Sequence, residues 1–216
     1  MTGAVSFHFD DGHNSHYRVL LPLFKKYGFV GSLSLIADEK RGMGFEKARM
    51  MQDEGWEILC HSKTHIKMDA PSAIDLAETE IAEAKRILEE NGLHTRQYVT
   101  PMSEAHESLL PILKEHFDAA FTVYTNALTV PLPDLLEEMP LSPYRLHRAC
   151  MKELPLERLI EMADYACDSG KWLVFYDHDI GYSTNVTEQI LDGLLAHCKE
   201  RGIPVLTSTE GLKRFA

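Results

Sequence analysis

The sequence predicts an α/β protein whose parallel strands close into a barrel. Strand-like and helix-like segments alternate along the 216 residues, which implies right-handed crossovers and a parallel sheet. Seven or eight such units fit a barrel, if an irregular one, better than an open sheet. Polar clusters follow several of the strands, and such folds bind ligands at the carboxyl ends of their strands. We therefore expect one functional rim.

The predicted strands are short apolar segments bounded by turn residues. They cover residues 4–9, 30–36, 56–60, 97–100, 119–123, 144–151 and 172–176. The predicted helices have apolar residues at steps of three and four, and several end at a glycine. They cover residues 20–27, 45–54, 72–90, 109–116, 156–169 and 187–201, and a short helix ends the chain. With no linker or repeat, residues 1–216 are predicted to form a single domain.

The helix predicted over residues 72–90 has the clearest pattern. Ser72 and Asp75 resemble a capping box at its start, and Pro71 precedes them. Its charged residues, Glu80 among them, are interpreted as a solvated face. Residues 124–142 contain several prolines and are predicted to form a loop.

Composition excludes several classes of protein. The chain is 44% hydrophobic and 25% charged, as in soluble globular proteins. A net charge of −11 disfavours nucleic acid or an anionic membrane surface as partner. No apolar run approaches the roughly 18 residues of a membrane helix. The first motif follows the N-terminus directly, leaving no room for a secretory signal, so a cytoplasmic protein is expected. The sequence does not define an oligomeric state.

The four cysteines are scattered, without the C-x-x-C spacing of a metal site. Cys60, Cys150, Cys167 and Cys198 are therefore interpreted as reduced, mostly buried thiols.

The first polar cluster follows the first strand. Asp10, Asp11 and Gly12 end this strand, between His8 and His13. Asp-Gly is a common turn pair, so one interpretation is a turn alone. The other is that both carboxylates reach one cavity at the frayed end of the strand. Two further polar clusters, at residues 61–65 and 177–179, each follow an apolar segment and favour the second interpretation.

A metal site is the second hypothesis. His61 and His65 are four residues apart, so on a helical turn they share a face and can bind one metal ion. Asp11 can complete a His-His-Asp set with an open position. Such a set suits one divalent ion, with Zn²⁺ favoured and Co, Ni, Mn or Fe as alternatives. The metal would lower the pKa of a water towards about 7.

Hydrolysis by such a water needs a base and an acid. Asp10, beside the metal ligand, is the candidate base. His178 is the candidate acid because its ordinary pKa, about 6.5, suits proton donation. Either Asp177 or Asp179 can hold His178 protonated.

Several segments resemble motifs of the polysaccharide deacetylase family, the NodB-homology or carbohydrate esterase family 4 type. Phe9-Asp10-Asp11-Gly12 is similar to the first motif, and residues 61–65 resemble the second, H-S/T-x-x-H. Residues 98–101, 143–148 and 173–178 resemble later motifs of a branch that lacks the usual arginine in the third.

The resemblance implies a distorted (β/α)₇ barrel and a metal-dependent hydrolase of carbon–nitrogen bonds. The substrate would be a sugar or sugar derivative bearing an N- or O-acetyl group. Asp11, His61 and His65 would hold the metal, with Asp10 as base and His178 as acid. Pro101 and Arg148 would bind or orient the substrate or Asp10; the alternative for Arg148 is a surface or ion-paired arginine.

The sequence also departs from the family pattern. Val99 stands where the third motif usually has arginine, and Ser103 where glycine is usual. The aspartate-tryptophan signature of the fourth motif is not found, which leaves the tuning of His178 unassigned. His8 is interpreted as a packed histidine or a neighbour of the site, and His13 as a solvated histidine or one at the cleft mouth.

Three other functions remain as alternatives. The first is a metal-dependent hydrolase of a non-sugar amide or cyclic ureide on the same scaffold. The second is a non-catalytic carbohydrate-binding relic, against which Asp10 and His178 argue. The third, phosphoryl transfer, would want a D-x-D motif or a glycine-rich phosphate loop, and neither is found. Without an export signal, a small or lipid- or nucleotide-linked sugar is preferred over an extracellular polymer.

Overall fold

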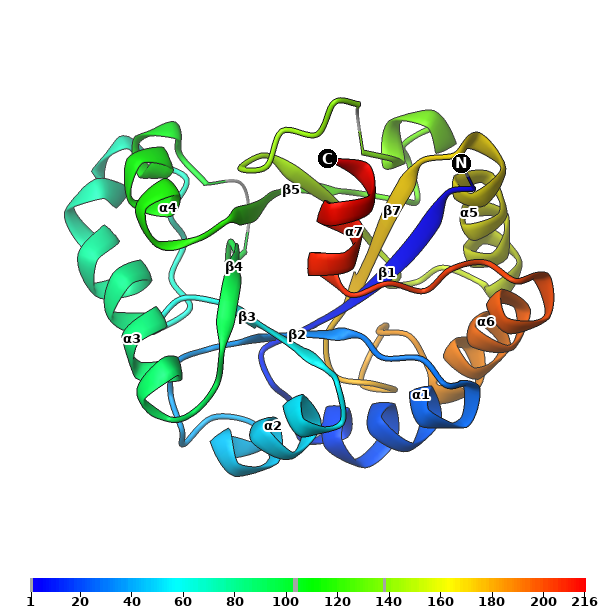
Figure 1. Cartoon of the computed structure of the whole chain (residues 1–216), viewed down its shortest axis with the longest axis horizontal. Helices are drawn as coiled ribbons and strands as arrows, with labels where there is room; N and C mark the ends of the chain where they lie inside the picture. Colours follow the sequence, from blue (N-terminus) through cyan, green and yellow to red (C-terminus); the bar gives the residue numbers. More distant parts are fainter. Residues whose placement is uncertain (1, 103–104, 138) are drawn as a thin grey trace.

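Seven parallel strands form a closed barrel in sequence order, and β1 pairs with β7 to complete it (Figure 1). The computed structural model describes residues 2–102, 105–137 and 139–216. The strands are β1 (Ala4–Asp10), β2 (Ser32–Leu35), β3 (Glu57–Cys60), β4 (Thr95–Val99), β5 (Ala119–Thr125), β6 (Leu146–Cys150) and β7 (Trp172–Asp177). The register shifts within the β3–β4 and β5–β6 pairs. The predicted distorted (β/α)₇ barrel is confirmed.

Helices connect most of the successive strands and surround the barrel, and two more helices follow β7 (Figure 1). They are α1 (Leu21–Tyr27), α2 (Gly44–Asp53), α3 (Glu83–Glu90), α4 (Leu110–His116), α5 (Leu156–Ser169), α6 (Glu188–Arg201) and α7 (Ser208–Phe215). Short helical turns cover His16–Leu20, Pro71–Leu76, Glu78–Ala82, Glu107–Leu109 and Leu132–Leu135. Among the described residues, none of the helices has the length and apolar character needed to cross a membrane.

The helix predicted over residues 72–90 is interrupted. A 3₁₀ segment, Pro71–Leu76, and a wider π turn, Glu78–Ala82, precede α3. The predicted capping box is wrong. Ala70 is the N-cap of the 3₁₀ segment and no side chain caps it, because Pro71 already starts the segment and Ser72 lies inside its first turn.

Residues along β1 alternate between the barrel interior and the surrounding helices, as the pleat of a strand requires. Val5, Phe7 and Phe9 pack in the main core under the helices. His8 faces inward, where its Nε2 lies 2.7 Å from Ser208 Oγ and its ring lies edge-on to Phe121. The packed-histidine interpretation of His8 is therefore confirmed.

Helix α7 closes the amino end of the barrel. The Phe215 ring stacks on Trp172, the first residue of β7, with 6.2 Å between ring centroids. The Trp172 indole N–H donates to Ser6 Oγ inside the barrel at 2.9 Å. Glu57, at the start of β3, accepts a hydrogen bond from the Thr209 backbone N–H at 3.1 Å. With this end filled, the inward residues at the carboxyl end of the strands line the cavity described below.

Candidate metal centre and catalytic cleft

A tight turn after β1 separates the two adjacent aspartates. Asp11 and Gly12 both have left-handed backbone angles, with φ of 70° and 66°. The Gly12 carbonyl accepts the Met43 backbone N–H at 2.7 Å. A Cβ on Gly42 would lie 2.0 Å from the same carbonyl oxygen, so only glycine allows this close approach. The turn therefore has the Asp-Gly geometry and also presents two carboxylates to one site.

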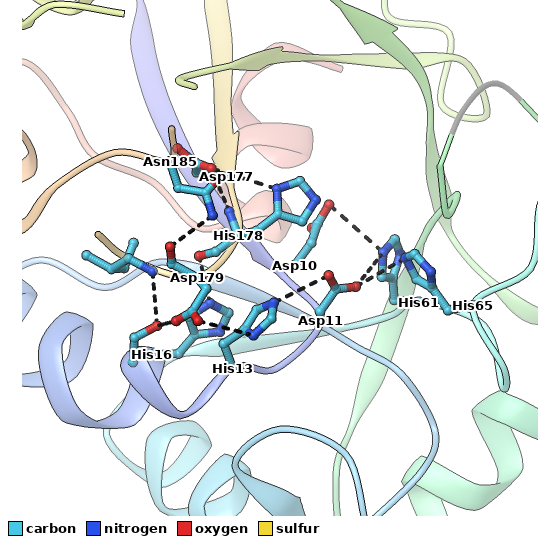
Figure 2. Close-up of polar contacts among 12 residues, drawn as sticks. Asp10, Asp11, His13, His16, His61, His65, Asp177, His178, Asp179 and Asn185 are labelled. Carbon is cyan, nitrogen blue, oxygen red and sulfur yellow. Dashed lines mark hydrogen bonds and ion pairs between the residues drawn. The ribbon is translucent and has the colours of Figure 1, made fainter. Parts of the chain in front are cut away.

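Asp11, His61 and His65 converge at the centre of the site (Figure 2). Asp11 Oδ1 lies 3.1 Å from His65 Nε2 and 3.6 Å from His61 Nε2, and the three ligand atoms lie within 4.8 Å of one another. Asp11 Oδ1 is buried and, among the described residues, accepts no hydrogen bond. A buried carboxylate oxygen without a donor, facing two imidazole nitrogens, is the donor set of a divalent cation. The residues present fit the expected metal.

His61 is oriented for ligation by the strand next to it. Its Nδ1 donates to the Val99 carbonyl oxygen at the end of β4, at 2.9 Å. This hydrogen bond leaves the Nε2 lone pair facing Asp11, the usual arrangement behind a metal-bound histidine. Burial lowers the pKa of His61, which favours the neutral imidazole that a metal needs.

The chain from His61 to His65 is an irregular loop, not the helical turn that their spacing suggested. Ser62 and His65 have φ of 61° and 63°, and Ser62 Oγ accepts the His65 backbone N–H at 2.9 Å. Glu80 holds the loop by accepting the Thr64 backbone N–H at 2.8 Å and the Thr64 hydroxyl at 2.7 Å. The interpretation of Glu80 as part of a solvated face is therefore wrong: it is 4% exposed, because its side chain turns inward to this loop.

Asp10 forms a buried ion pair with Arg148 from β6. Arg148 Nη1 lies 2.8 and 2.9 Å from the two carboxylate oxygens, and the guanidinium stacks on the Tyr176 ring at 4.3 Å. Burial alone would raise the pKa of Asp10. The nearby positive charges, with Arg148 first, outweigh it and hold that pKa well below its usual range. Asp10 is therefore an ionised carboxylate with a fixed orientation.

His178 follows β7 and has Asp177 as its carboxylate partner. Asp177 is fully buried; its Oδ1 accepts the His178 backbone N–H at 2.8 Å and lies 3.7 Å from His178 Nδ1. Its Oδ2 accepts the Val186 backbone N–H at 2.7 Å. Burial would lower the pKa of His178, but the nearby carboxylates of Asp177, Asp10 and Asp11 raise it above its ordinary value. Asp177 thus supplies the tuning that the missing fourth motif left unassigned.

Most of the side chains just described line one cavity of about 310 Å³, and Asp11 lies beside it, facing His61 and His65. Its walls include Asp10, His61, His65, Arg148 and His178, together with Thr100, Met102, Phe121, Thr122, Val123, Tyr124, Cys150, Lys152 and Tyr176. Pro101 is buried between the lining residues Thr100 and Met102. Ser103, where the family pattern has glycine, lies outside the described residues.

Sequence reasoning missed several lining residues, notably Tyr124, Lys152 and Tyr176. A usable signal exists for Tyr176, which lies two residues after the inward-facing Val174 of β7. The same alternation identifies Arg148, two residues after the inward Leu146 of β6. Tyr124 gives no such signal, because the pairing register shifts between Phe121 and Val123.

The sequence matches the family model described as polysaccharide deacetylase over residues 2–116. This match covers more than half of the chain, and the chain belongs to the polysaccharide deacetylase family. A comparison with curated proteins gave no match.

Solved structures of carbohydrate esterase family 4 proteins share the fold. A pseudoenzyme of this family from Bacillus anthracis has a TM-score of 0.69 at 18% identity, covering 98% of this chain and 66% of that chain. A family 4 carbohydrate esterase from Streptomyces lividans, in complex with acetate, has a TM-score of 0.65 at 14% identity, covering 95% and 91%. A peptidoglycan deacetylase from Bacillus subtilis has a TM-score of 0.64 at 16% identity, covering 98% and 91%.

Proposed function

We propose that the protein is a metal-dependent deacetylase that releases acetate from an N- or O-acetylated sugar or sugar derivative. The observation that carries this proposal is the convergence of five side chains at one site. The three candidate metal ligands lie beside an ionised carboxylate, Asp10, and a histidine with a raised pKa, His178. Hydrolysis of an amide requires this combination of a proton acceptor and a proton donor.

Asp11, His61 and His65 would hold one divalent cation, and zinc suits two imidazoles and a carboxylate with an open position. Cobalt, nickel, manganese and iron suit a similar donor set. When bound, the cation supplies Lewis acidity towards a carbonyl group and towards water.

Asp10 and His178 divide the proton transfers. Asp10 accepts the proton of the attacking water, and Arg148 keeps its carboxylate ionised and in place through the pair at 2.8 Å. His178, held towards its protonated form by Asp177, donates a proton to the leaving nitrogen or oxygen. The products are acetate and the free amine or hydroxyl.

The cavity favours one acetylated sugar unit at the reaction centre. Its volume of about 310 Å³ is at the lower end of the range for ligand pockets. Tyr124 and Tyr176 supply aromatic rings to its wall, and Pro101 keeps the neighbouring lining residues in place. Similarity to an esterase solved with acetate and to a peptidoglycan deacetylase supports this substrate class. We propose a small cytoplasmic sugar derivative as the natural substrate.

A carbohydrate-binding protein without activity is the second candidate, because a pseudoenzyme shares the fold with a TM-score of 0.69. Against it stand the group of three candidate metal ligands and the presence of both Asp10 and His178 in the cavity wall. A hydrolase of a non-sugar amide would use the same set and differ in the substrate alone.

The test is acetate release from a panel of acetylated sugars and peptidoglycan fragments, with and without a chelator. We expect release that the chelator abolishes and zinc restores. Chelator-insensitive release would contradict the metal dependence. If no sugar is a substrate, a non-sugar amide or a binding function is favoured instead.

Asp10→Asn tests the base. We expect it to keep zinc binding and to lower kcat by about 10²–10⁴-fold, the usual contribution of a general base. Asp118→Asn is the matched control, because Asp118 forms an exposed pair with Arg96 at 2.6 Å; its kcat should equal that of the wild type. A fully active Asp10→Asn variant would show that the base assignment is wrong.

A further inference from the structure

His13 lies between two carboxylates at the edge of the candidate metal centre (Figure 2). Its Nε2 is 3.5 Å from Asp11 Oδ2, and its Nδ1 is 3.8 Å from Asp179 Oδ2. Its ring also lies edge-on to His16, with 5.6 Å between centroids. The His13 side chain is 34% exposed, so the solvated interpretation describes only one edge of the ring.

Asp179 is anchored to the loop that follows β7. Its Oδ1 accepts the Ser15 hydroxyl at 2.6 Å, and Ser15 Oγ accepts the Ile180 backbone N–H at 3.1 Å. The Asn185 side-chain amide donates to the Asp179 carbonyl oxygen at 2.9 Å. Asp179 Oδ2 is therefore a fixed partner for His13.

The two oxygens of Asp11 have separate partners. Oδ1 faces His61 and His65 at 3.6 and 3.1 Å, whereas Oδ2 faces His13 at 3.5 Å. A carboxylate turns freely about its last torsion unless both oxygens are held. A second contact on Oδ2 keeps Oδ1 aimed at the cation position, as partners behind metal ligands commonly do.

We propose that His13, braced by Asp179, is a positioning residue for Asp11 that sets the affinity of this site for a divalent cation. The contacts from Asp11 through His13 to Asp179 join the turn after β1 to the loop after β7. The same loop carries His178. The inference rests on the metal site of the proposed function. It adds that ligand geometry in this chain depends on a histidine outside the three ligands.

The experiment measures the Kd of metal-free protein for Zn²⁺ by competition with a chromophoric chelator, and the visible absorption of the Co²⁺ form. The variants are His13→Ala, His13→Gln and Asp179→Asn. His94→Ala is the control, since His94 is exposed in the turn before β4. Circular dichroism of each metal-free variant checks the fold.

We expect His13→Ala to weaken Zn²⁺ binding by about 10–100-fold and to alter the Co²⁺ spectrum. Asp179→Asn should weaken binding less. His13→Gln, whose amide can still donate to Asp11, should restore part of the affinity, which a purely structural loss would not allow. If folded His13→Ala binds Zn²⁺ with wild-type affinity, the proposed positioning role of His13 is wrong, whereas the metal site itself stands. If the wild-type protein binds neither Zn²⁺ nor Co²⁺, both the positioning role of His13 and the proposed function are wrong.

Discussion

Asp10 and Asp11 are neighbours in the chain, yet they have different partners because the backbone turns sharply between them. Asp10 pairs with Arg148 at 2.8 Å, and Asp11 faces His61 and His65. The presence of polar residues just after apolar segments was enough to predict that the two aspartates and the two histidines meet at one site. The spacing alone could not assign a partner to each carboxylate, because the partners come from other strands.

The same limit applies to His178. Asp177 and Asp179 flank it in sequence, and nothing in their spacing distinguishes them. In the structure Asp177 contacts His178, with 3.7 Å from its Oδ1 to Nδ1. Asp179 contacts Ser15 and His13 instead. The choice depends on the path of the loop after β7, which a local sequence pattern does not encode.

Asp177→Asn tests this partnership through pH dependence. The nearby carboxylate of Asp177 raises the pKa of His178, so loss of its charge should lower that pKa. Because His178 must carry a proton to act as the acid, the alkaline limb of the kcat–pH profile should move to lower pH. The measurement is kcat across pH 5–10 for the wild type and the variant. Coincident alkaline limbs would show that Asp177 does not tune the acid.

At the scale of elements, the spacing of His61 and His65 predicted that the two side chains lie close together, but it predicted the wrong local structure for the chain between them. Two histidines four positions apart suggest a helical turn. The structure instead places the two ring centroids 4.9 Å apart, in a loop with two left-handed residues. Buried Glu80, from the turn before α3, holds this loop. Apolar periodicity predicted a helix there but could not show that one glutamate faces inward.

Glu80→Ala should destabilise the protein and loosen the metal site. The exposed Thr64 would lose the acceptor of its backbone N–H and hydroxyl; a hydrogen bond of this kind contributes about 0.5–1.5 kcal/mol to stability, and the loop that carries His65 would lose this contact. Chemical unfolding and Zn²⁺ affinity measure the two effects. Glu78→Ala is the matched control, because Glu78 is exposed on the same helical turn. Equal stability and affinity in the two variants would contradict this role of Glu80.

Helix ends were predictable where the signal is local. The helix predicted over 156–169 has these bounds in the structure, with Gly170 left-handed at its C-cap. The interruption before α3 was not predictable, because 3₁₀, π and α turns place apolar residues at nearly the same steps. Local capping rules therefore predict boundaries better than periodicity predicts the type of turn.

At the scale of the whole molecule, alternation of strands and helices predicted a parallel sheet and favoured a barrel, the family resemblance implied its distorted (β/α)₇ form, and the closed barrel agrees. Closure of the barrel depends on contacts between segments far apart in the sequence. Helix α7 fills the amino end, and His8 reaches its first residue, Ser208. These contacts join residues about 200 positions apart, so no sequence window contains them. One domain over residues 1–216 and a cytoplasmic location stay predictions.

His16 joins the turns after β1 and β7 and should make folding sensitive to acid. It is buried, its Nε2 lies 3.1 Å from the His178 carbonyl oxygen, and burial lowers its pKa from 6.5 to about 4. Between pH 6.5 and about 4, His16 binds a proton in the unfolded chain but not in the folded protein. The contribution of neutral His16 to the free energy of unfolding is therefore full above pH 6.5 and is lost as the pH falls to about 4. At about 1.4 kcal/mol per pKa unit, His16 accounts for about 3 kcal/mol of this loss.

The measurement compares unfolding free energies of metal-free wild type and His16→Phe between pH 4 and 7. His8 and His61, whose pKa values are also lowered, titrate in both proteins, so the difference between the two curves isolates His16. Phenylalanine retains the packing against Phe9, whose ring centroid lies 5.8 Å from that of His16. The variant should lose less stability than the wild type on acidification. It lacks the buried imidazole that must stay neutral where the turns after β1 and β7 meet. If the unfolding free energies of the two proteins fall in parallel between pH 7 and 4, His16 does not contribute to the acid sensitivity of folding.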